Sequence, residues 1–541
     1  MNFAGFSWSN PYPTVRTPVF ARNVVATSHP LAASAGLRML ASGGNAVDAA
    51  VAGAAVIALT EPCSNGLGSD LFALVWDRDR LHGLNASGTA PSAWTRAYFV
   101  HRYGPDCAAT RPVRGWDTVT VPGAVAGWAA LHRRFGQLSF DAVLAPAIAY
   151  AECGFAVSPI TQEKWRRGAA LLADQPGFSE HFLPFGRAPN VGEHVTIPGA
   201  ARTLRGIAQS QGEAFYRGEI ASAIASFARA TGGLLTQADL ASYVPQWVEP
   251  IATAFHGYEL HQIPPNGQGI AALMCLGILR HTPLATYAVD SADWYHVSIE
   301  AMKLAFADVY AHVADPAAMA VGTEQLLDDA YLRSRAQQID MRQAGAFSAG
   351  RALRGGTIYL TAADERGTMV SLIQSNFMGF GSGVVVPGWG IALQNRGYAF
   401  SLDAAHPNCV APGKRPFHTI IPAFLTRGGQ PQMSFGVMGG NMQPQGQVQT
   451  LCRILLAHQQ PQAACDGPRW KWNQGLEIEV ESSMHPAARQ ELARRGHQIV
   501  TVEDSYMDFG SGQFLWRLGD PASAGYVAAS DSRRDGQACG F

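Results

Sequence analysis

The sequence predicts a layered α+β fold in which helices pack against a largely antiparallel sheet. With 541 residues the chain exceeds what one ordinary hydrophobic core serves, so two cores or one large layered domain are expected. Helical spacing of apolar residues dominates up to about residue 355, and strand-like runs rich in β-branched residues dominate after it. Apolar residues make up 47% and charged residues 15%, which is typical of a well-buried globular chain.

The first part of the chain is expected to be mostly helical. Residues 29–42 place apolar side chains at helical spacing and stop at Gly43-Gly44, a composition typical of a helix end. Residues 45–60 continue as an Ala/Val-rich helix with almost no polar face, which indicates burial on nearly all sides. Further helices are expected at 123–135, 139–153, 217–230, 268–280 and 291–314.

A β-hairpin is expected in the second part of the chain. Two strand-like runs, 357–363 and 368–376, flank the turn composition of residues 364–367. Antiparallel pairing about this turn sets Thr357 opposite Ser375, with both side chains on one face of the sheet. Further strands are expected at 71–76, 390–395, 419–425 and 432–438, with helices near 445–458 and 486–495.

Two features of the second part of the chain are candidates for a catalytic role. A threonine at a strand start, faced by the Ser375 hydroxyl, suits a nucleophile that needs a hydrogen-bond partner. The alternative is a Thr357–Ser375 cross-strand pair without function, and the pattern alone favours it. The strand-like run before Gly439-Gly440 ends at a predicted helix start, where backbone N–H groups can stabilise an oxyanion. A tight strand-to-helix turn would give the same pattern.

Composition and motifs exclude several classes of protein. Forty basic and forty-one acidic side chains leave a net charge of −1, so neither nucleic acid nor an anionic membrane is expected as a partner. The sixteen histidines form no HxH or HExxH pattern, and residues 65–69 lack the Gly-Lys-Ser/Thr of a phosphate loop, so neither a metal nor a cofactor is predicted. The chain start lacks a secretory signal and the apolar stretch 49–59 is too short to span a bilayer, so a cytoplasmic protein is expected.

A set of short motifs occurs in one order along nearly the whole chain. They lie at residues 29–36 (HPLAASAG), 43–50 (GGNAVDAA), 235–240, 264–265, 300–308, 412–416, 438–440 and 530–536 (SDSRRDG). Together they resemble the γ-glutamyltransferase family of N-terminal-nucleophile hydrolases. The resemblance implies a four-layer αββα sandwich, made as a precursor that cuts itself before a threonine.

The family's catalytic residues can be carried over one by one. Thr357 matches the cleavage-point threonine, because it precedes Asp364 by the seven residues of the family pattern. Ser375 matches the second hydroxyl residue, which is usually a threonine. Gly439 and Gly440 match the pair that forms the oxyanion hole.

The resemblance also implies how the chain is processed. The Thr357 hydroxyl attacks the Gly356 carbonyl, and water hydrolyses the resulting ester. Cleavage gives a large subunit, residues 1–356, and a small subunit, residues 357–541, which stay together in one intertwined domain. Two copies of this assembly could also associate as a dimer, and the sequence does not decide between these states. The freed α-amine of Thr357, with a reference pKa near 8, then serves as the general base when the hydroxyl attacks a substrate amide.

The residues that would recognise a γ-glutamyl group depart from the family pattern. Ser87 stands where an arginine is expected, Arg396 and Ala399 replace a glutamine and an aspartate, and His418-Thr419 replaces a pair of serines. The pocket is therefore expected to lack a carboxylate for the substrate ammonium. Arg396 would repel that ammonium and would suit the bare carboxylate of a glutaryl-type group, although a structural ion pair explains this arginine equally well.

Three functions follow. The first is a self-processing γ-glutamyltransferase-like amidohydrolase or acyltransferase, acting on a small amide with water or an amine as acceptor. The second is an acylase on glutaryl-type or small dicarboxylic monoamides, similar to the cephalosporin-acylase and oxamate-amidohydrolase relatives of the family. The third is an unprocessed, non-catalytic relative that only binds a small acid.

Overall fold

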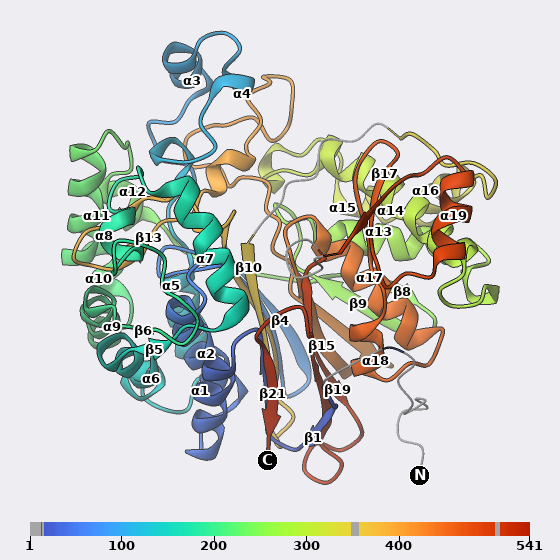
Figure 1. The fold of residues 1–541 in the computed structure, drawn as a ribbon, viewed down its shortest axis with the longest axis horizontal. Coiled ribbons are helices and arrows are strands. Elements are labelled where there is room, and N and C mark those ends of the chain that lie inside the picture. The colour runs from blue at the N-terminus through green and yellow to red at the C-terminus, as the bar shows by residue number, and fades with distance from the viewer. Residues whose placement is uncertain (1–11, 13–15, 348–355, 504–508) are drawn as a thin grey trace.

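The computed structural model describes residue 12 and residues 16–347, 356–503 and 509–541. Two seven-stranded antiparallel sheets lie face to face at its centre (Figure 1). The first has the order β1 (Val19–Ala21), β20 (Tyr526–Ser530), β19 (Ser511–Arg517), β15 (Gln430–Met438), β14 (Ala423–Arg427), β9 (Tyr258–Gln262) and β8 (Ile251–Phe255). The second has the order β21 (Gln537–Gly540), β2 (Val24–Thr27), β10 (Gly356–Ala363), β11 (Met369–Phe377), β3 (Asp70–Asp77), β4 (Arg80–Ala86) and β7 (Gln246–Val248).

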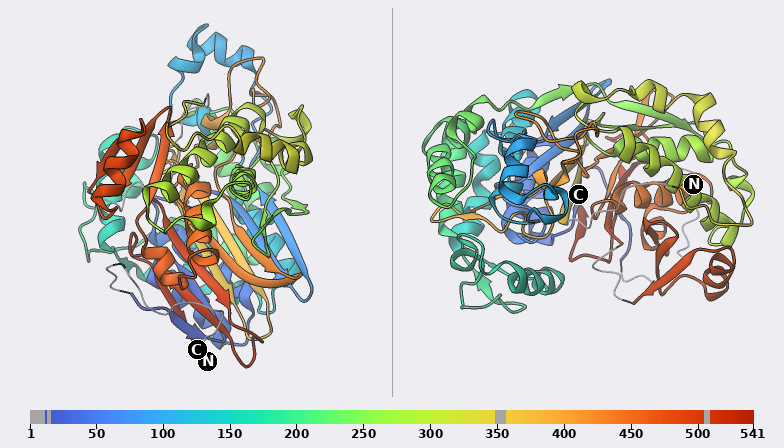
Figure 2. Two further views of the ribbon diagram at one scale, coloured as in Figure 1. Left: turned by 90° about the vertical axis from the view of Figure 1, so that its right-hand side faces the viewer. Right: turned by 90° about the horizontal axis from the view of Figure 1, so that it is seen from above.

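Helices cover the outer face of each sheet, which completes the expected αββα layers. The two helical layers lie on opposite sides of the sheets in the right-hand view of Figure 2. The second sheet is covered by α1 (Pro30–Ala41), α2 (Ala46–Thr60), α5 (Ala124–Phe135) and α6 (Phe140–Cys153). The first is covered by α13 (Gly269–Leu279), α14 (Ala292–His312) and α17 (Met442–Leu455).

A separate apolar core fills each of the three spaces between layers. Between the sheets lie aromatic and aliphatic side chains from both, including Phe72, Tyr359, Phe424 and Leu515. Helix α2 shows how sequence sets the outer layer, because all of its residues are buried, as its missing polar face predicts. Burying this much apolar surface is the main force that holds the layers together.

Smaller elements surround this sandwich. The remaining helices are α3 (Arg96–Tyr103), α4 (Cys107–Thr110), α7 (Pro159–Leu172), α8 (Phe178–Phe182), α9 (Pro198–Ser210), α10 (Glu213–Arg217), α11 (Glu219–Ala230), α12 (Gln237–Ser242), α15 (Thr323–Leu326), α16 (Asp329–Ala336), α18 (Pro461–Asp466) and α19 (Pro486–Arg494). The remaining strands are β5 (Phe155–Ala156), β6 (His194–Val195), β12 (Val385–Val386), β13 (Ile391–Ala392), β16 (Trp470–Gln474), β17 (Glu477–Glu481) and β18 (Gln498–Val502). Across the described ranges, no helix has the length and apolar character needed to cross a bilayer.

Two predicted strands differ from the structure. Only Ile391–Ala392 of the run 390–395 is a strand, and a 3₁₀ turn follows at Arg396–Ala399. The run 419–425 becomes a strand only at Ala423. Before that point, backbone groups bond to a neighbouring loop and helix instead of a strand, as where the Ile421 N–H donates to Gln443 Oε1 at 3.0 Å.

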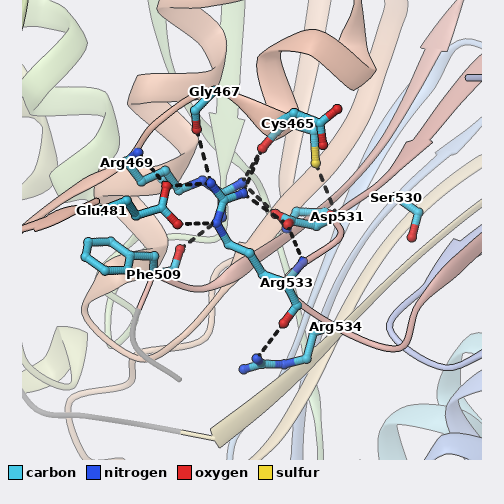
Figure 3. Close-up of polar contacts among 12 residues, drawn as sticks. Cys465, Gly467, Arg469, Glu481, Phe509, Ser530, Asp531, Arg533 and Arg534 are labelled. Atoms are coloured by element: carbon cyan, nitrogen blue, oxygen red, sulfur yellow. Dashed lines mark hydrogen bonds and ion pairs between the residues drawn. The ribbon is translucent and has the colours of Figure 1, made fainter. Parts of the chain in front are cut away.

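The motif near the chain end builds a buried ion network (Figure 3). Asp531 accepts a hydrogen bond from Arg469 Nη2 at 2.7 Å, and Arg533 donates to both carboxylate oxygens of Glu481 at 2.6 Å. Burial alone would raise the pKa of the Asp531 carboxyl, but the two guanidinium groups hold that pKa well below its usual range. The network ties β17 to the segment that follows β20.

Candidate active site

The hairpin β10–β11 brings Thr357 and Ser375 into contact. The strands pair in the expected register from the turn back to Ile358–Gln374. A bulge between Gly356 and Ile358 then shifts the register, so Gly356 pairs with Phe377 and Thr357 is not directly opposite Ser375 as the sequence predicted. The buried Thr357 hydroxyl donates to Ser375 Oγ at 3.3 Å. The hydroxyl contact expected from the turn composition is therefore present.

Ser375 also contacts the carbonyl group that precedes Thr357. Its hydroxyl donates to the Gly356 oxygen at 2.6 Å and accepts the Phe377 N–H at 2.7 Å. Phe377 has a φ of 76°, a left-handed conformation that is unfavourable for a bulky aromatic residue and is common at functional sites. Ser375 is thus positioned to polarise the Gly356 carbonyl while it touches the Thr357 hydroxyl.

The row of polar residues continues across the second sheet. Ser375 pairs with Asp70 on β3, and the pairing of Leu71 with Ala86 places Ser87 just beyond Asp70 on the β4 side. Directly opposed residues share one face of a sheet, so Ser375 and Asp70 lie side by side, whereas Ser87 follows the last paired residue of β4 and donates to Asn85 Oδ1 at 2.8 Å. The sequence motifs pointed to Ser87 but gave no indication of Asp70.

Arg396 is fully buried beside this row. Its Nη1 donates to Thr419 Oγ1 at 2.8 Å and its Nη2 to Ser375 Oγ at 3.3 Å, and the guanidinium lies 4.2 Å from the Phe377 ring centroid. Burial lowers the pKa of Arg396 to about 9, and Asp70 opposes that shift. Arg396 Nε has no hydrogen-bond partner within the described ranges.

Asp70 places a carboxylate beside the substituted recognition residues. It accepts the N–H groups of Gly88 and Gly123 at 3.1 Å each, and its other oxygen lies 3.0 Å from His418 Nε2. Burial raises the pKa of Asp70 to about 7, although Arg396 lowers it. The sequence predicted no carboxylate among the recognition residues, and β3 brings one beside Arg396 and His418 from a distant part of the chain; whether it faces a substrate ammonium stays a prediction.

His418 and Thr419 have separate contacts. The Ile420 N–H donates to His418 Nδ1 at 3.3 Å, which leaves the proton on Nε2 to face Asp70. Burial, followed by Arg396, lowers the pKa of His418 well below its usual value, so the ring is neutral. Thr419 presents its hydroxyl to Arg396 instead.

Gly439 and Gly440 form a turn between β15 and α17. Their φ values are 120° and 62°, and an added Cβ on Gly439 would lie 3.0 Å from the Gly510 Cα. Their backbone N–H groups find no acceptor among the described residues. In the first turn of α17, which follows the glycine pair, Gln443 Nε2 donates to Thr357 Oγ1 at 3.4 Å. No sequence motif pointed to Gln443.

One buried cluster has the residue types of a metal site. His296, Glu300 and His497 bring their potential ligand atoms within 4.8 Å of one another. Lys303 Nζ donates to Glu300 Oε1 at 2.8 Å, the two rings contact at 2.9 Å, and His296 Nε2 lies 2.9 Å from the Asp340 carbonyl oxygen. The Lys303 ammonium already occupies the place of a cation, and the histidine ring nitrogens already have hydrogen-bond partners. The cluster therefore does not fit a divalent cation, and we interpret it as a structural network.

Comparisons with known proteins match this arrangement. The Gamma-glutamyltranspeptidase family matches residues 32–541. The chain is 36% identical over 497 residues to the glutathione hydrolase-like YwrD proenzyme of Bacillus subtilis, covering 90% of this chain and 93% of that protein. It is 35% identical over 540 residues to the oxamate amidohydrolase proenzyme of Klebsiella pneumoniae, covering 97% and 99%. The crystal structure of cephalosporin acylase from Bacillus halodurans aligns with a TM-score of 0.92 at 47% identity, covering 98% of both chains.

Proposed function

The chain belongs to the γ-glutamyltranspeptidase family, and we propose that it is a self-processing amidohydrolase that cleaves itself between Gly356 and Thr357. The observation that carries this proposal is the pair of hydrogen bonds from one side chain, Ser375, to the Thr357 hydroxyl and the Gly356 carbonyl. The word proenzyme in the names of the two curated relatives supports processing.

Self-cleavage uses only groups that are already in contact. Thr357 Oγ1 adds to the Gly356 carbonyl carbon, whose oxygen is polarised by the Ser375 hydroxyl. The bond between Gly356 and the Thr357 nitrogen then breaks, and that nitrogen takes up the proton given up by the hydroxyl. Water hydrolyses the ester, which leaves a carboxylate on Gly356 and a free α-amine on Thr357.

Turnover repeats the attack on an external amide. The α-amine of Thr357, with a reference pKa near 8, removes the hydroxyl proton as Oγ1 attacks the substrate carbonyl. The N–H groups of Gly439 and Gly440 stabilise the developing oxyanion. The α-ammonium of Thr357 then gives its proton to the substrate nitrogen, which leaves as the amine, and water or a second amine resolves the acyl-enzyme.

The proposed substrate is a monoamide of a dicarboxylic acid, such as a glutaryl amide. Arg396 can offer a carboxylate its unpaired Nε and a fork of charged donors, as arginine does at many carboxylate sites. γ-Glutamyl amides are the second candidate, because Asp70 supplies a carboxylate that could balance an ammonium. Oxamate amidohydrolase and cephalosporin acylase among the matched proteins support the first candidate.

Purification of the expressed protein tests the proposal. We expect two chains, 1–356 and 357–541, that co-elute on size exclusion and separate on denaturing electrophoresis, with Thr357 at the new N-terminus. Thr357→Ala should remain one inactive chain. Thr361→Ala, which removes another buried hydroxyl of β10, is the matched control and should still cleave. An intact active chain would contradict the proposal, and an intact inactive wild type would point to a relative that only binds a small acid.

A further inference from the structure

A cavity of about 410 Å³ lies against Gly356, the residue before the proposed cleavage point. Helix α7, which lies beside β10 in Figure 1, forms one wall. Four cationic side chains line the cavity, and no carboxylate is among its lining residues; the four are Arg114, Lys164, Arg167 and Arg534. Because they come from three separate segments of the chain, only the folded structure assembles them.

Three of these cations have protein partners. Arg114 Nη1 donates to the Gly379 carbonyl at 2.7 Å and also to the Gly381 carbonyl. Arg167 pairs with Glu163 at 2.6 Å on the exposed side of α7. Arg534 follows the ion network of Figure 3 and donates to the Arg533 carbonyl at 3.0 Å. These contacts hold the positive groups in place around the cavity.

Lys164 is different, because no hydrogen bond or ion pair joins its ammonium to any residue in the described parts of the chain, although the residue is half-buried. Burial and the nearby Arg534 lower the pKa of Lys164 to about 8. The nearest carboxylates are occupied elsewhere, since Glu61 accepts the hydroxyls of Ser28 and Ser64, and Asp535 caps the first turn of α7. An unpaired cation in a cavity is stabilised by a bound anion.

We propose that this cavity is a carboxylate-binding subsite for the amide substrate, with Lys164 as its principal cation. This proposal rests on the proposed function, and it places the carboxylate next to Gly356, close to the reacting bond. The subsite is distinct from Arg396, which does not line the cavity. If the leaving amine carries this carboxylate, Arg396 remains the proposed partner of the acyl carboxylate. If the acyl group carries it, Lys164 replaces Arg396 in that role.

Lys164 makes the binding dependent on pH. Lys164 is charged below its pKa of about 8, so carboxylate affinity should be full below that pH and fall above it. Arg534, the Cys63 thiol, Glu61 and Asp535 act electrostatically on this ammonium, and Arg114 and Arg167 line the same cavity. None of these groups needs to change charge for the effect. Because arginine stays protonated, Lys164→Arg should remove the loss of affinity above pH 8.

Two matched pairs of amides identify which end of the substrate carries the carboxylate. Glutaryl- and butyryl-p-nitroanilide differ only in an acyl carboxylate, and butyryl amides of 4-nitroaniline and 5-amino-2-nitrobenzoate differ only in an amine carboxylate. Lys164→Met should raise KM about tenfold or more for the charged member of one pair, with kcat within twofold and the neutral member unchanged. Arg166→Met, on the exposed face of α7, is the control and should change neither. The proposal would be overturned if Lys164→Met raised KM equally for the charged and neutral members of both pairs, or if it changed KM for neither member.

A binding measurement separates this subsite from the proposed function. Calorimetry with glutarate and with 2-nitrobenzoate on the purified protein needs no turnover. We expect at least one of them to bind, Lys164→Met to weaken that binding about tenfold, and Lys164→Arg to keep it. Weakened binding without any amide cleavage would reject the proposed function and keep the subsite. Binding that ignores Lys164→Met, or no binding by either anion, would reject the subsite even in an active enzyme.

Discussion

At the scale of single residues, Ser375 Oγ is where the candidate chemistry converges. It touches the Thr357 hydroxyl, the Gly356 carbonyl, the Phe377 N–H and Arg396 Nη2 within 3.3 Å. One side chain therefore links the attacking group, the attacked group and the cation proposed to bind substrate. The strained backbone at Phe377 is explained by the same need, since its N–H holds Ser375 in position.

Removing the Ser375 hydroxyl should slow self-cleavage. Ser375→Ala leaves the Gly356 carbonyl unpolarised, so we expect the precursor to process at least tenfold more slowly in a time course followed by denaturing electrophoresis. Folding should survive, because one hydrogen bond contributes only about 1 kcal/mol. Ser375→Thr keeps the hydroxyl and should process at a rate near wild type. Unchanged kinetics in Ser375→Ala would remove this residue from the mechanism.

The choice of substrate is also decided by single residues. We expect glutaryl-p-nitroanilide to be turned over better than γ-glutamyl-p-nitroanilide, which differs only by an α-ammonium that Arg396 repels. Arg396→Ala should raise KM for the glutaryl amide about tenfold, consistent with losing roughly 1.5–3 kcal/mol of a charged hydrogen bond. Butyryl-p-nitroanilide, which has no carboxylate, is the control substrate. A clear preference for the γ-glutamyl amide would show that Asp70 outweighs Arg396.

At the scale of elements, the hairpin β10–β11 and helix α2 are joined by one side chain. Asp364 accepts the Arg366 and Thr368 N–H groups within the turn, and its other oxygen accepts the Ala46 N–H at the start of α2 at 2.9 Å. The turn that joins β10 to β11 is thereby tied to a helix whose residues are all buried.

Losing the Asp364 carboxylate should destabilise both elements. Asp364→Ala leaves the buried Ala46 N–H without an acceptor, so we expect the free energy of unfolding to fall by about 2–4 kcal/mol in urea titrations. Glu365→Gln, at an exposed neighbour that forms only a 3.6 Å surface ion pair, is the control and should change it by less than about 1 kcal/mol. An equal loss of unfolding free energy in the two variants would contradict the proposed role of Asp364 in joining the hairpin to α2.

At the scale of the whole molecule, both sheets mix strands from either side of the proposed cleavage point. In the second sheet β10 lies between β2 and β11, and in the first sheet β14 lies between β9 and β15. Separating residues 1–356 from 357–541 would break ladders in both sheets and expose the core between them. This interleaving is the physical reason to expect the two chains to stay together after cleavage.

The ion network near the chain end should make this assembly sensitive to acid. Folding lowers the Asp531 pKa, so its stabilisation is complete above the ordinary aspartate pKa of about 4 and is lost as the pH falls below it. Asp531→Asn leaves Arg469 and Arg533 without this partner and should cost about 3–5 kcal/mol in urea unfolding at pH 7. Thr357→Ala is the background for this comparison, because it keeps one chain. Asp79→Asn, at an exposed aspartate, is the control. An equal loss of unfolding free energy in that variant would contradict a stabilising role for the ion network.

The sequence by itself determined the local parts of the site. The turn at residues 364–367 fixes the pairing of the adjacent strands as far as Ile358 and Gln374, so the residue pattern alone brought Thr357 within contact of Ser375, although a bulge interrupts the ladder at Thr357. A helix without a polar face identified α2 as buried, and the glycine pair marked the turn before α17. These features depend on residues that are neighbours in sequence. Local backbone preferences control the geometry of such residues.

Only the tertiary structure decided which distant residues join them. Asp70 reaches Ser375 through the pairing of β3 with β11, and Gln443 reaches Thr357 through the packing of α17 on the sheets. Lys164 shares a cavity with Arg534 because two chain segments far apart in sequence meet beside Gly356. No local pattern encodes such contacts, since they follow from how whole layers bury their apolar faces against one another.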